Sequence, residues 1–283
     1  MQKKDPMTSE TGKAAPALFH GASVVMLKPG ERIDDLQRGG CRIIQREDMF
    51  CFGMDAVLLA AFAKVKRTDR VLDLCSGNGV IPILMDARIV PGCGEGEARP
   101  QFTGVEINPV CVDMARRSVL MNGQQERVRF LEEDIRNVCT AGAKTVLEPA
   151  CAPSSFDAVT ANPPYMTGGA GLTGENRDLT IARHEVLCNI GDVAAAASRA
   201  LRFGGHLYLV HRPHRLMDIC RACGANGLEV KRLRMVHPFA EKEANMVLID
   251  AVKGGRSYVH AEAPLIIYRE KGVYTQEVRE IYG

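Results

Sequence analysis

The chain has 283 residues, of which 25% are charged, and a formal net charge of +2. This length suits one large α/β domain or two small ones, and the near-neutral charge excludes a protein that binds nucleic acid through net charge alone. The first residues, Met1 to Lys13, contain no apolar run, so we expect neither a signal peptide nor a membrane span there. We interpret residues 1–30 as a mobile tail.

Residues 31–64 are predicted to form a small N-terminal cap. Glu31 to Gln45 should form a hairpin, and Met54 to Lys64 should form a helix that leads into the first strand. Strand and helix signals then alternate from Val71 to Val252 without a linker rich in Pro, Ser or Gly. This pattern favours a single α/β domain over residues 31–283.

Seven strands are expected in this domain. An Ala-rich helix over residues 194–201 separates the fourth and fifth strands, with Asn189 and Asp192 as candidate caps and Gly204-Gly205 as its stop. Residues 264–282 should form a short strand and then a helix. The strands should begin near Val71, Phe102, Val128, Phe156, His206, Glu229 and Asn245.

A glycine-rich turn follows the first predicted strand. Val71 to Leu74 are typical of a short buried strand, and the glycines at 77 and 79 let the backbone come close to a ligand. Pro82 stands where the dinucleotide fingerprint needs a Gly or Ala, which argues against a pyrophosphate-binding loop. Asp73 adds a carboxylate suited to a cationic amino group.

Acidic residues end the second and third predicted strands. Glu106 ends the second strand farther from Gly77 than the usual ~20 residues, and the insertion Pro91 to Glu97 accounts for the excess. A carboxylate at this strand end can accept hydrogen bonds from both ribose hydroxyls. The third strand runs from Val128 into an acidic end that includes Asp134. Each acid taken singly could be a solvated surface charge, but their order along the strands argues for a site.

The fourth strand runs into Asn162-Pro163-Pro164-Tyr165. Phe156 to Ala161 are apolar and partly β-branched, as in a buried central strand. Two prolines then end any strand pairing and form a rigid rim at the strand's carboxyl end, where α/β proteins bind ligands. The Asn162 amide can accept hydrogen bonds from a planar NH2 group, and the Tyr165 ring can stack on the group that carries it. An ordinary Pro-rich strand exit is the alternative.

Two clusters of basic residues could meet nucleic acid. Arg212 and Arg215 follow the fifth strand at the carboxyl edge, where they could contact phosphate, although a solvated face is the alternative. For the cluster Lys231 to Arg234 in the sixth strand we favour a solvated face.

Ten cysteines are scattered over the chain. Without a secretory signal we expect reduced thiols in a cytosolic protein. Cys220 and Cys223 form the only Cys-x-x-Cys pair, and a structural zinc site would need a second pair. We therefore expect no metal.

These motifs together resemble the class I S-adenosylmethionine-dependent methyltransferases, specifically the subgroup whose Asn-Pro-Pro-Tyr motif acts on planar nitrogens. Within this subgroup the chain resembles the tRNA(Val) adenine-N6 methyltransferase family. The resemblance spans roughly residue 31 to the C-terminus. The closer match depends on Glu31 to Leu36, Ile43 to Gln45, Phe50 to Ala60, Ala182 to Glu185 and Val210 to Pro213.

The resemblance implies a Rossmann-like sheet of seven strands, mostly parallel, with the last strand antiparallel between the fifth and sixth. It implies S-adenosylmethionine as the cofactor, with the methionine end by Asp73 and the glycine-rich turn and the ribose on Glu106. The adenine would lie near Ile107 and between Asp134 and the Ile135 backbone. Phe52 and Asp55 match an N-terminal motif that closes over the cofactor, but Asp55 could instead cap the helix after it. The implied cofactor-binding residues are Phe52, Asp55, Asp73, Gly77, Gly79, Glu106, Ile107, Asp134, Ile135 and Asn162.

The implied reaction is methyl transfer to the exocyclic N6 amine of an adenine in RNA, with tRNA as the partner, in the cytoplasm. The Asn162 amide oxygen and the Pro163 carbonyl would accept hydrogen bonds from the amine and aim its lone pair at the donor methyl. Tyr165 would stack on the target base, and Arg212 and Arg215 would contact the substrate. The product cation can lose its proton to water, so no strong general base is needed.

A protein glutamine-N5 methyltransferase, acting on a release factor or ribosomal protein, is the alternative because the same motif can hold a glutamine amide. A helical protein-binding domain ahead of the fold would support it, and few residues precede the fold here. The loop Gly168 to Gly171 could close over the acceptor or be an ordinary loop. Arg183 and His184 match the family segment without a chemical role that we can assign.

Overall fold

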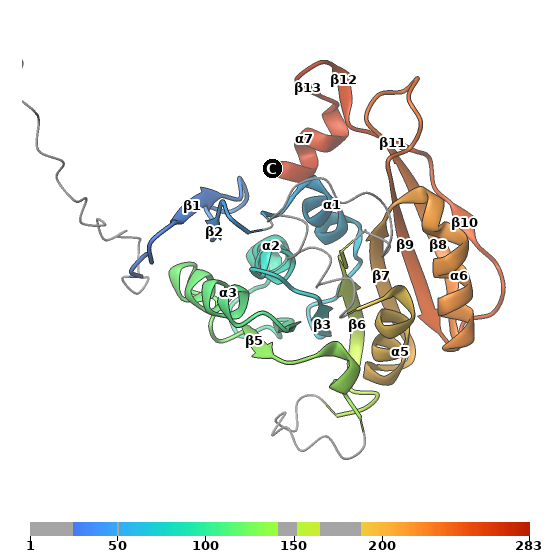
Figure 1. Ribbon diagram of the computed structural model, residues 1–283, viewed down its shortest axis with the longest axis horizontal. Helices are drawn as coiled ribbons and strands as arrows, with labels where there is room; N and C mark the ends of the chain where they lie inside the picture. Colours follow the sequence, from blue (N-terminus) through green and yellow to red (C-terminus); the bar gives the residue numbers. More distant parts are fainter. Residues whose placement is uncertain (1–24, 50, 141–151, 165–187) are drawn as a thin grey trace, which may run out of the picture.

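The computed structural model describes residues 25–49, 51–140, 152–164 and 188–283. Within these residues, helices cover both faces of a central sheet (Figure 1). Several residues named above lie outside the described residues: most of the predicted tail (1–24), Tyr165, the loop Gly168 to Gly171, Arg183 and His184.

Five parallel strands form the centre of the sheet. β3 (Arg70–Leu74) lies between β4 (Gln101–Glu106) and β6 (Phe156–Ala161). β5 (Val128–Glu132) pairs with the far side of β4, and β7 (Leu201–His211) pairs with the far side of β6. Because helices cover both faces, β3 and β6 are buried at nearly consecutive positions, whereas β5 at the end of the sheet alternates buried and half-buried residues.

The antiparallel strand expected near the end of the sheet is present. β9 (Met246–Lys253) lies between β7 and β8 (Leu228–His237) and is antiparallel to both. The seven long strands therefore have the order β8-β9-β7-β6-β3-β4-β5, and the prediction that the last strand lies between the fifth and sixth is confirmed. Two short strands, β10 (His260–Ala261) and β11 (Leu265–Ile266), pair with β8, so the sheet formed by the described residues has nine strands.

Two hydrophobic clusters fill the space between helices and sheet. On one face, Leu58, Ile83 and Val119 pack with Val71 of β3, whereas Leu72 faces the other cluster. Successive strand residues thus serve opposite faces. The first face is covered by α1 (Met54–Phe62), α2 (Val80–Ile89) and α3 (Pro109–Met121), and the second by α5 (Ile190–Ala200) and α6 (Leu216–Ala225) (Figure 1).

The predicted N-terminal hairpin is formed by β1 (Glu31–Asp35) and β2 (Arg42–Arg46). It is fixed to α3, where the Ser118 hydroxyl accepts the Ile44 N–H at 3.0 Å. Val25 is buried in a small cluster that also includes Ile44. The packed part of the described chain thus begins ahead of residue 31, where we placed the domain boundary.

Helix α5 differs from its predicted bounds. Asn189 caps it in a capping box with Asp192, so it begins at Ile190 rather than at 194. It ends at Ala200, and β7 begins at the next residue, so Gly204 and Gly205 lie inside the strand. The pairing of β6 with β7 shifts register at this point, and Gly204 has φ +74°. These glycines therefore serve a bulge in the strand, and the prediction of a helix stop was wrong.

The C-terminal region contains the expected short strand and helix, together with a hairpin. β12 (Tyr268–Glu270) and β13 (Val273–Tyr274) precede α7 (Gln276–Tyr282), which packs on α1. The rings of Tyr268, Tyr274 and Tyr282 stack in series with centroids 5.2 and 5.5 Å apart. They are packing groups, as tyrosines usually are. Three short 3₁₀ helices complete the described elements: η1 (Val90–Gly92), η2 (Ile135–Asn137) and η4 (Pro213–Arg215).

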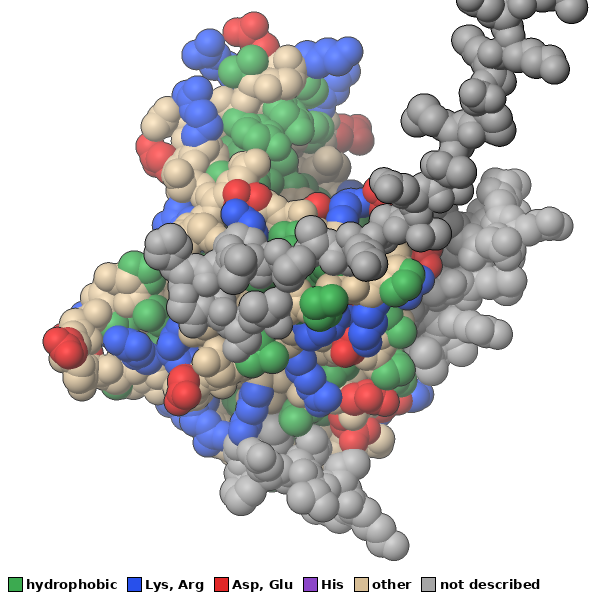
Figure 2. All heavy atoms as spheres, turned by 90° about the vertical axis from the view of Figure 1, so that its left-hand side faces the viewer, with side chains coloured by type: hydrophobic (Ala, Val, Ile, Leu, Met, Phe, Trp, Pro, Cys, Tyr) green, Lys and Arg blue, Asp and Glu red, His purple; other side chains and the backbone are tan. Residues whose placement is uncertain are grey.

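The face of the molecule shown in Figure 2 has no single dominant charge. On the face shown in Figure 2, Lys and Arg side chains form separate groups interrupted by acidic and apolar ones. None of the helices that the structure describes is long and apolar enough to cross a membrane.

Candidate active site

The predicted site residues follow the carboxyl ends of neighbouring strands. Leu74 on β3 is opposite Val105 on β4 and Ala161 on β6. Glu106 and Asn162 each follow directly, so they begin at the same level on either side of the glycine-rich turn. Open α/β sheets bind ligands at this edge, and the strand order brings the predicted site residues of β3, β4 and β6 together there.

The glycine-rich turn adopts left-handed backbone conformations. Cys75, Gly77 and Gly79 have φ angles of +56°, +54° and +86°. A Cβ on Gly79 would lie 2.4 Å from Cζ of Phe130, and one on Gly104 would lie 2.3 Å from Cδ1 of the same ring. Phe130 therefore fills the notch that the two glycines leave, so Gly79 is required both for its φ angle and for its lack of a side chain.

Asp73 is buried beneath the turn. Its side chain accepts hydrogen bonds from the hydroxyls of Ser76, at 2.5 Å, and Thr160, at 2.6 Å. Burial raises the pKa of the Asp73 carboxyl to about 7, although the two hydroxyl hydrogen bonds act in the opposite direction. Since Asp73 is only 1% exposed, its observed contacts bind the turn to β6, and its predicted contact with an amino group stays a prediction.

Glu106 links the end of β4 to the same turn. Its two carboxyl oxygens accept the N–H groups of Gly77 and Asn108, each at 2.9 Å. A carboxylate has about four acceptor positions, so these two bonds leave capacity for the hydroxyls of a ligand. The neighbouring Ile107 is exposed and offers an apolar surface. The ribose contact of Glu106 and the adenine contact of Ile107 stay predictions.

Asp134 and Ile135 follow β5 and have separate environments. Asp134 caps η2 by accepting the Arg136 N–H at 2.9 Å and also pairs with the Arg136 guanidinium. The side-chain hydrogen bond from Arg136 holds the pKa of Asp134 below its usual range. The side chain of Ile135 is buried in the core, which leaves its backbone as the part suited to the predicted adenine contact.

Gln45 joins the N-terminal hairpin to the glycine-rich turn. Its side-chain oxygen accepts the Phe52 N–H at 3.0 Å and the Asn78 side-chain amide at 3.4 Å, and its own amide donates to Asp34. Asn78 also donates to the Ile44 carbonyl at 3.3 Å. The Gln45 side chain, 3% exposed, thus positions the segment that contains Phe52. The sequence places Gln45 in a segment that matches the family but indicates no role for its side chain.

Asp55 lies in the first turn of α1 but is not its cap. The N-cap position is Gly53, so the alternative that Asp55 is the N-cap of this helix was wrong. The Asp55 carboxylate accepts the Ala56 N–H at 2.9 Å. A Cβ on Gly53 would lie 2.8 Å from the same carboxylate. Glycine at 53 therefore gives Asp55 room, and the cofactor role of Phe52 and Asp55 stays a prediction.

Asn162, Pro163 and Pro164 continue directly from β6, which ends at Ala161. Pro163 is buried, and the residues on either side are half-buried. Because proline has no N–H, this segment cannot extend the pairing with the neighbouring strands. The structure thus has the rim expected beside the glycine-rich turn, while the stacking role of Tyr165 stays a prediction.

Arg212 and Arg215 lie at the carboxyl end of β7. Arg212 donates to the Asn245 carbonyl at 3.0 Å, and Arg215 forms an ion pair with Asp218 at 2.9 Å. The buried His211 accepts the Arg212 N–H at 2.8 Å, and its burial, aided by nearby Arg215, lowers the pKa of this imidazole to about 4. His211 is therefore neutral near pH 7. Phosphate contacts of the two arginines stay predictions.

The arginines of β8 are held in ion pairs. Arg232, whose side chain is 11% exposed, donates to Glu262 at 2.9 Å and to Asp250 at 3.4 Å. Arg234 pairs with Glu277 of α7 at 2.7 Å. The interpretation of this cluster as a solvated face was therefore wrong for Arg232, because neighbouring strands and the C-terminal segment cover it.

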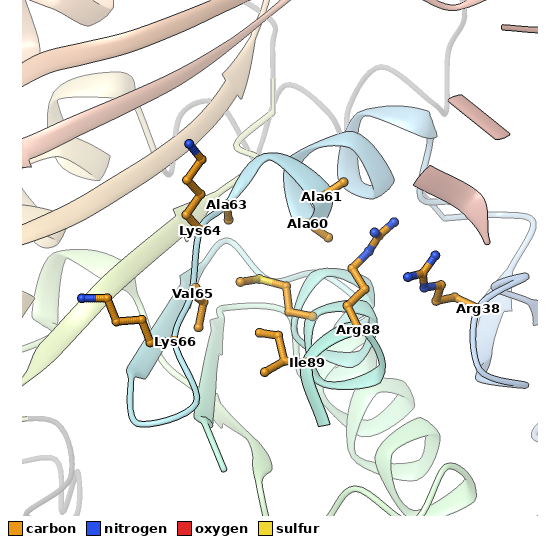
Figure 3. A pocket seen from close by; sticks show the side chains of 10 residues that line it. Arg38, Ala60, Ala61, Ala63, Lys64, Val65, Lys66, Arg88 and Ile89 are labelled. Carbon is orange, nitrogen blue, oxygen red and sulfur yellow. The ribbon is translucent and has the colours of Figure 1, made fainter. Parts of the chain in front are cut away.

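A hollow of about 530 Å³ lies between the last turns of α1 and α2 (Figure 3). Arg38 and Arg88 face each other on one side of it, and Lys64 and Lys66 project on the other. Arg88 donates to the Ile281 carbonyl, and its burial, together with nearby Arg38, lowers the pKa of its guanidinium to about 10. These helix ends lead towards the starts of β3 and β4, so the hollow is at the opposite edge from the candidate active site.

A metal centre is not visible in the described ranges. They contain no group of three or more His, Cys, Asp or Glu side chains placed to hold a metal ion.

No family model matches the chain, but curated relatives do. The tRNA1(Val) (adenine(37)-N6)-methyltransferase of Phocaeicola vulgatus is 26% identical over 197 residues, which cover 70% of this chain and 74% of that protein. The protein of the same name from Aeromonas hydrophila is 27% identical over 223 residues, 79% of this chain and 84% of that protein. For the Haemophilus influenzae protein, 28% identical over 145 residues, the chain spans about half the relative's length, 54%.

Solved structures give the same class of fold. A predicted O-methyltransferase from Agrobacterium tumefaciens has a TM-score of 0.63 and 26% identity, covering 81% of this chain and 95% of that chain. A putative class I S-adenosylmethionine-dependent methyltransferase from Listeria monocytogenes has a TM-score of 0.51 at 14% identity, covering 81% and 68%, and shows the fold alone. The chain therefore has the class I fold and is an S-adenosylmethionine-dependent methyltransferase.

Proposed function

We propose that the enzyme methylates the exocyclic N6 amine of an adenine in RNA, and that its substrate is a tRNA. The observation that carries the proposal is the position of Asn162, Pro163 and Pro164 directly after β6, the strand that pairs with β3 and so lies next to its glycine-rich turn. An amide placed there can meet a planar amine beside the donor. The relatives named tRNA1(Val) (adenine(37)-N6)-methyltransferase support the choice of tRNA.

The cofactor pocket is assigned to the groups along the same edge. When bound, S-adenosylmethionine supplies a methyl group that its sulfonium already activates. Glu106, which holds Gly77 and Asn108 with two of its acceptor positions, would accept the ribose hydroxyls with the others. The left-handed turn would let the backbone approach the methionine end, and Asp134 would accept from the adenine amine.

Asn162 and Pro163 position the acceptor in this proposal. An adenine amine is a poor nucleophile because its lone pair is delocalised into the ring. Hydrogen bonds from N6–H to the Asn162 amide oxygen and the Pro163 carbonyl favour a more tetrahedral nitrogen and orient its lone pair. Holding reacting groups in line lowers the barrier without a strong base, and Tyr165 would stack on the base after it leaves its neighbours.

Recognition of the RNA requires more than one base. Because Arg215 already pairs with Asp218 and the net charge is only +2, we expect only about 3–5 phosphate contacts and a slope of log affinity against log salt of about −2 to −4. Arg212 and Arg215 at the end of β7 are the candidate contacts. A tRNA substrate would place the enzyme in the cytoplasm.

The test is methyl transfer from tritiated S-adenosylmethionine to four acceptors side by side. We expect labelling of folded bulk tRNA to exceed that of a short oligonucleotide, duplex DNA and a glutamine-containing release factor. Asn162→Ala should lower the rate roughly 10²–10³-fold, a much larger effect than any weakening of cofactor binding.

The matched control is Asn226→Ala. Asn226 donates to the Ala222 carbonyl at the end of α6, away from the strand exits, so this variant should turn over at the wild-type rate. Labelling of the release factor alone would overturn the RNA assignment in favour of glutamine methylation. A wild-type rate for Asn162→Ala would overturn its assigned role.

A further inference from the structure

Two cysteines from distant parts of the sequence meet beside the glycine-rich turn. The Sγ atoms of Cys75 and Cys188 lie 3.6 Å apart. Cys75 is the turn residue with φ +56°, and Cys188 directly precedes Asn189, the cap of α5. Neither thiol has a part in the proposed methyl transfer, which leaves their contact without an assigned purpose.

The environment of the pair suits an ordered oxidation. The hydrogen bond with Cys188 and burial raise the pKa of the Cys75 thiol well above its usual range, and the carboxylates of Glu106 and Asp73 act in the same direction. Cys75 therefore reacts with a peroxide more slowly than a thiol of ordinary pKa. Both thiols are half-buried, and we assign the first reaction with the oxidant to Cys188 because the raised pKa of Cys75 disfavours the thiolate of that residue. A disulfide needs the sulfurs to approach from 3.6 Å to about 2.05 Å.

We propose that Cys75 and Cys188 form a site of reversible thiol oxidation, with a two-electron oxidant such as hydrogen peroxide as its substrate. The Cys188 sulfur attacks one peroxide oxygen, the O–O bond breaks, and a sulfenic acid and one water result. The Cys75 sulfur then attacks the Cys188 sulfur, the S–O bond breaks, and the hydroxyl leaves with the Cys75 proton as a second water. A dithiol reverses the disulfide by exchange.

Closure of this bond would alter the candidate cofactor pocket. Cys75 lies between Leu74, at the end of β3, and Ser76, whose hydroxyl holds Asp73. The next residue, Gly77, donates its N–H to Glu106. A displacement of Cys75 towards α5 therefore moves the turn away from Glu106, so the oxidised enzyme should bind S-adenosylmethionine more weakly. This consequence rests on the proposed placement of the cofactor, whereas the formation of the bond does not.

The experiment uses the full chain, reduced and then treated with hydrogen peroxide. After the free thiols are blocked with N-ethylmaleimide, mass spectrometry of a non-reduced digest should show a peptide that links Cys75 to Cys188. Calorimetry should show the Kd for S-adenosylmethionine rising at least about tenfold and recovering with dithiothreitol. Cys188→Ser should form no link and lose the peroxide effect, while the matched control Cys220→Ser, on α6, should retain both.

The outcomes separate the proposals. Oxidation of other cysteines without the Cys75–Cys188 link would overturn the site. A link that leaves the Kd unchanged would overturn its control of the cofactor. If the reduced enzyme binds no S-adenosylmethionine while the link forms, the placement of the cofactor fails and the oxidation site stands. In unmodified protein, N-ethylmaleimide should label Cys188 before Cys75, and the reverse order would contradict the ordered mechanism without any variant.

Discussion

Gly79→Ala should destabilise the enzyme for two separable reasons. Gly79 has φ +86°, a conformation that costs an L side chain about 1–3 kcal/mol. In addition, the new Cβ would lie 2.4 Å from Cζ of Phe130 and 3.1 Å from Cβ of Ala115. Overpacking of this kind costs about 1–3 kcal/mol. After subtraction of the about 0.4–1 kcal/mol that alanine gains through the unfolded chain, we expect a loss of about 1–6 kcal/mol, with a central value of about 3 kcal/mol.

Gly123→Ala is the matched control because it isolates the backbone term. Gly123 also has a positive φ, +65°, but no atom lies within 4 Å of the position that a Cβ would take there. Gly123→Ala should therefore lower the free energy of unfolding only by the cost of its backbone conformation, about 1 kcal/mol. In a double-mutant cycle, Phe130→Leu should make Gly79→Ala less costly by about 1 kcal/mol, since a smaller side chain relieves the close contact.

Urea unfolding at fixed pH measures these free energies, and calorimetry measures cofactor binding by the folded variants. The clash should displace the turn, so Gly79→Ala should also bind S-adenosylmethionine more weakly, whereas Gly123→Ala should bind it as the wild type does. Equal destabilisation of the two variants with unchanged m values would refute the steric argument. An additive cycle would show that Phe130 is not the group that excludes a side chain at 79.

Three further changes test the electrostatics and hydrogen bonds of the site. Burial raises the pKa of Asp73 from its ordinary value of about 3.9 to about 7. The stability of the wild type relative to Asp73→Asn should therefore fall as pH rises between these values, because the carboxyl ionises in the unfolded chain while the buried one keeps its proton. Parallel stability-against-pH profiles of the two proteins in urea unfolding would contradict this. Glu106→Ala should weaken S-adenosylmethionine binding in calorimetry while EDTA leaves wild-type binding intact, and strict metal dependence would oppose the assignment. Gln45→Leu removes the hydrogen bonds to Asp34, Phe52 and Asn78. It should lower the free energy of unfolding by about 1–3 kcal/mol and should raise the KM for S-adenosylmethionine more than it lowers kcat. The exposed Gln276→Leu should change neither quantity, and equal effects of the two substitutions would remove Gln45 from the positioning network.

The elements predicted best from the sequence depend on local signals. The run Val71 to Leu74 before a glycine-rich turn, and Phe156 to Ala161 before two prolines, each combine strand propensity with an unambiguous stop. Their correct order also predicts that the carboxyl ends share one sheet edge, since parallel strands connected through helices must run the same way. The structure confirms this arrangement of strands.

Two predictions from local sequence were wrong because contacts with residues distant in the sequence determine the structure there. Gly204 and Gly205 look like a helix stop, but the pairing of β7 with β6 places them in a bulge. Arg232 looks like a solvated charge, but Asp250 and Glu262 surround it. In both cases the residue's own type allows two structures, and a contact across the sheet selects one.

The sequence by itself determined the alternation of strands and helices, the polar group at each strand end and the rim formed by residues 162–164. Only the tertiary structure decided how these groups are held. The pKa of Asp73 depends on burial and on Thr160 from another strand, and Cys75 meets Cys188 across a separation of 113 residues. The physical reason is that propensity and turn chemistry act between neighbours in the chain, whereas desolvation, hydrogen bonding and steric exclusion act between neighbours in space.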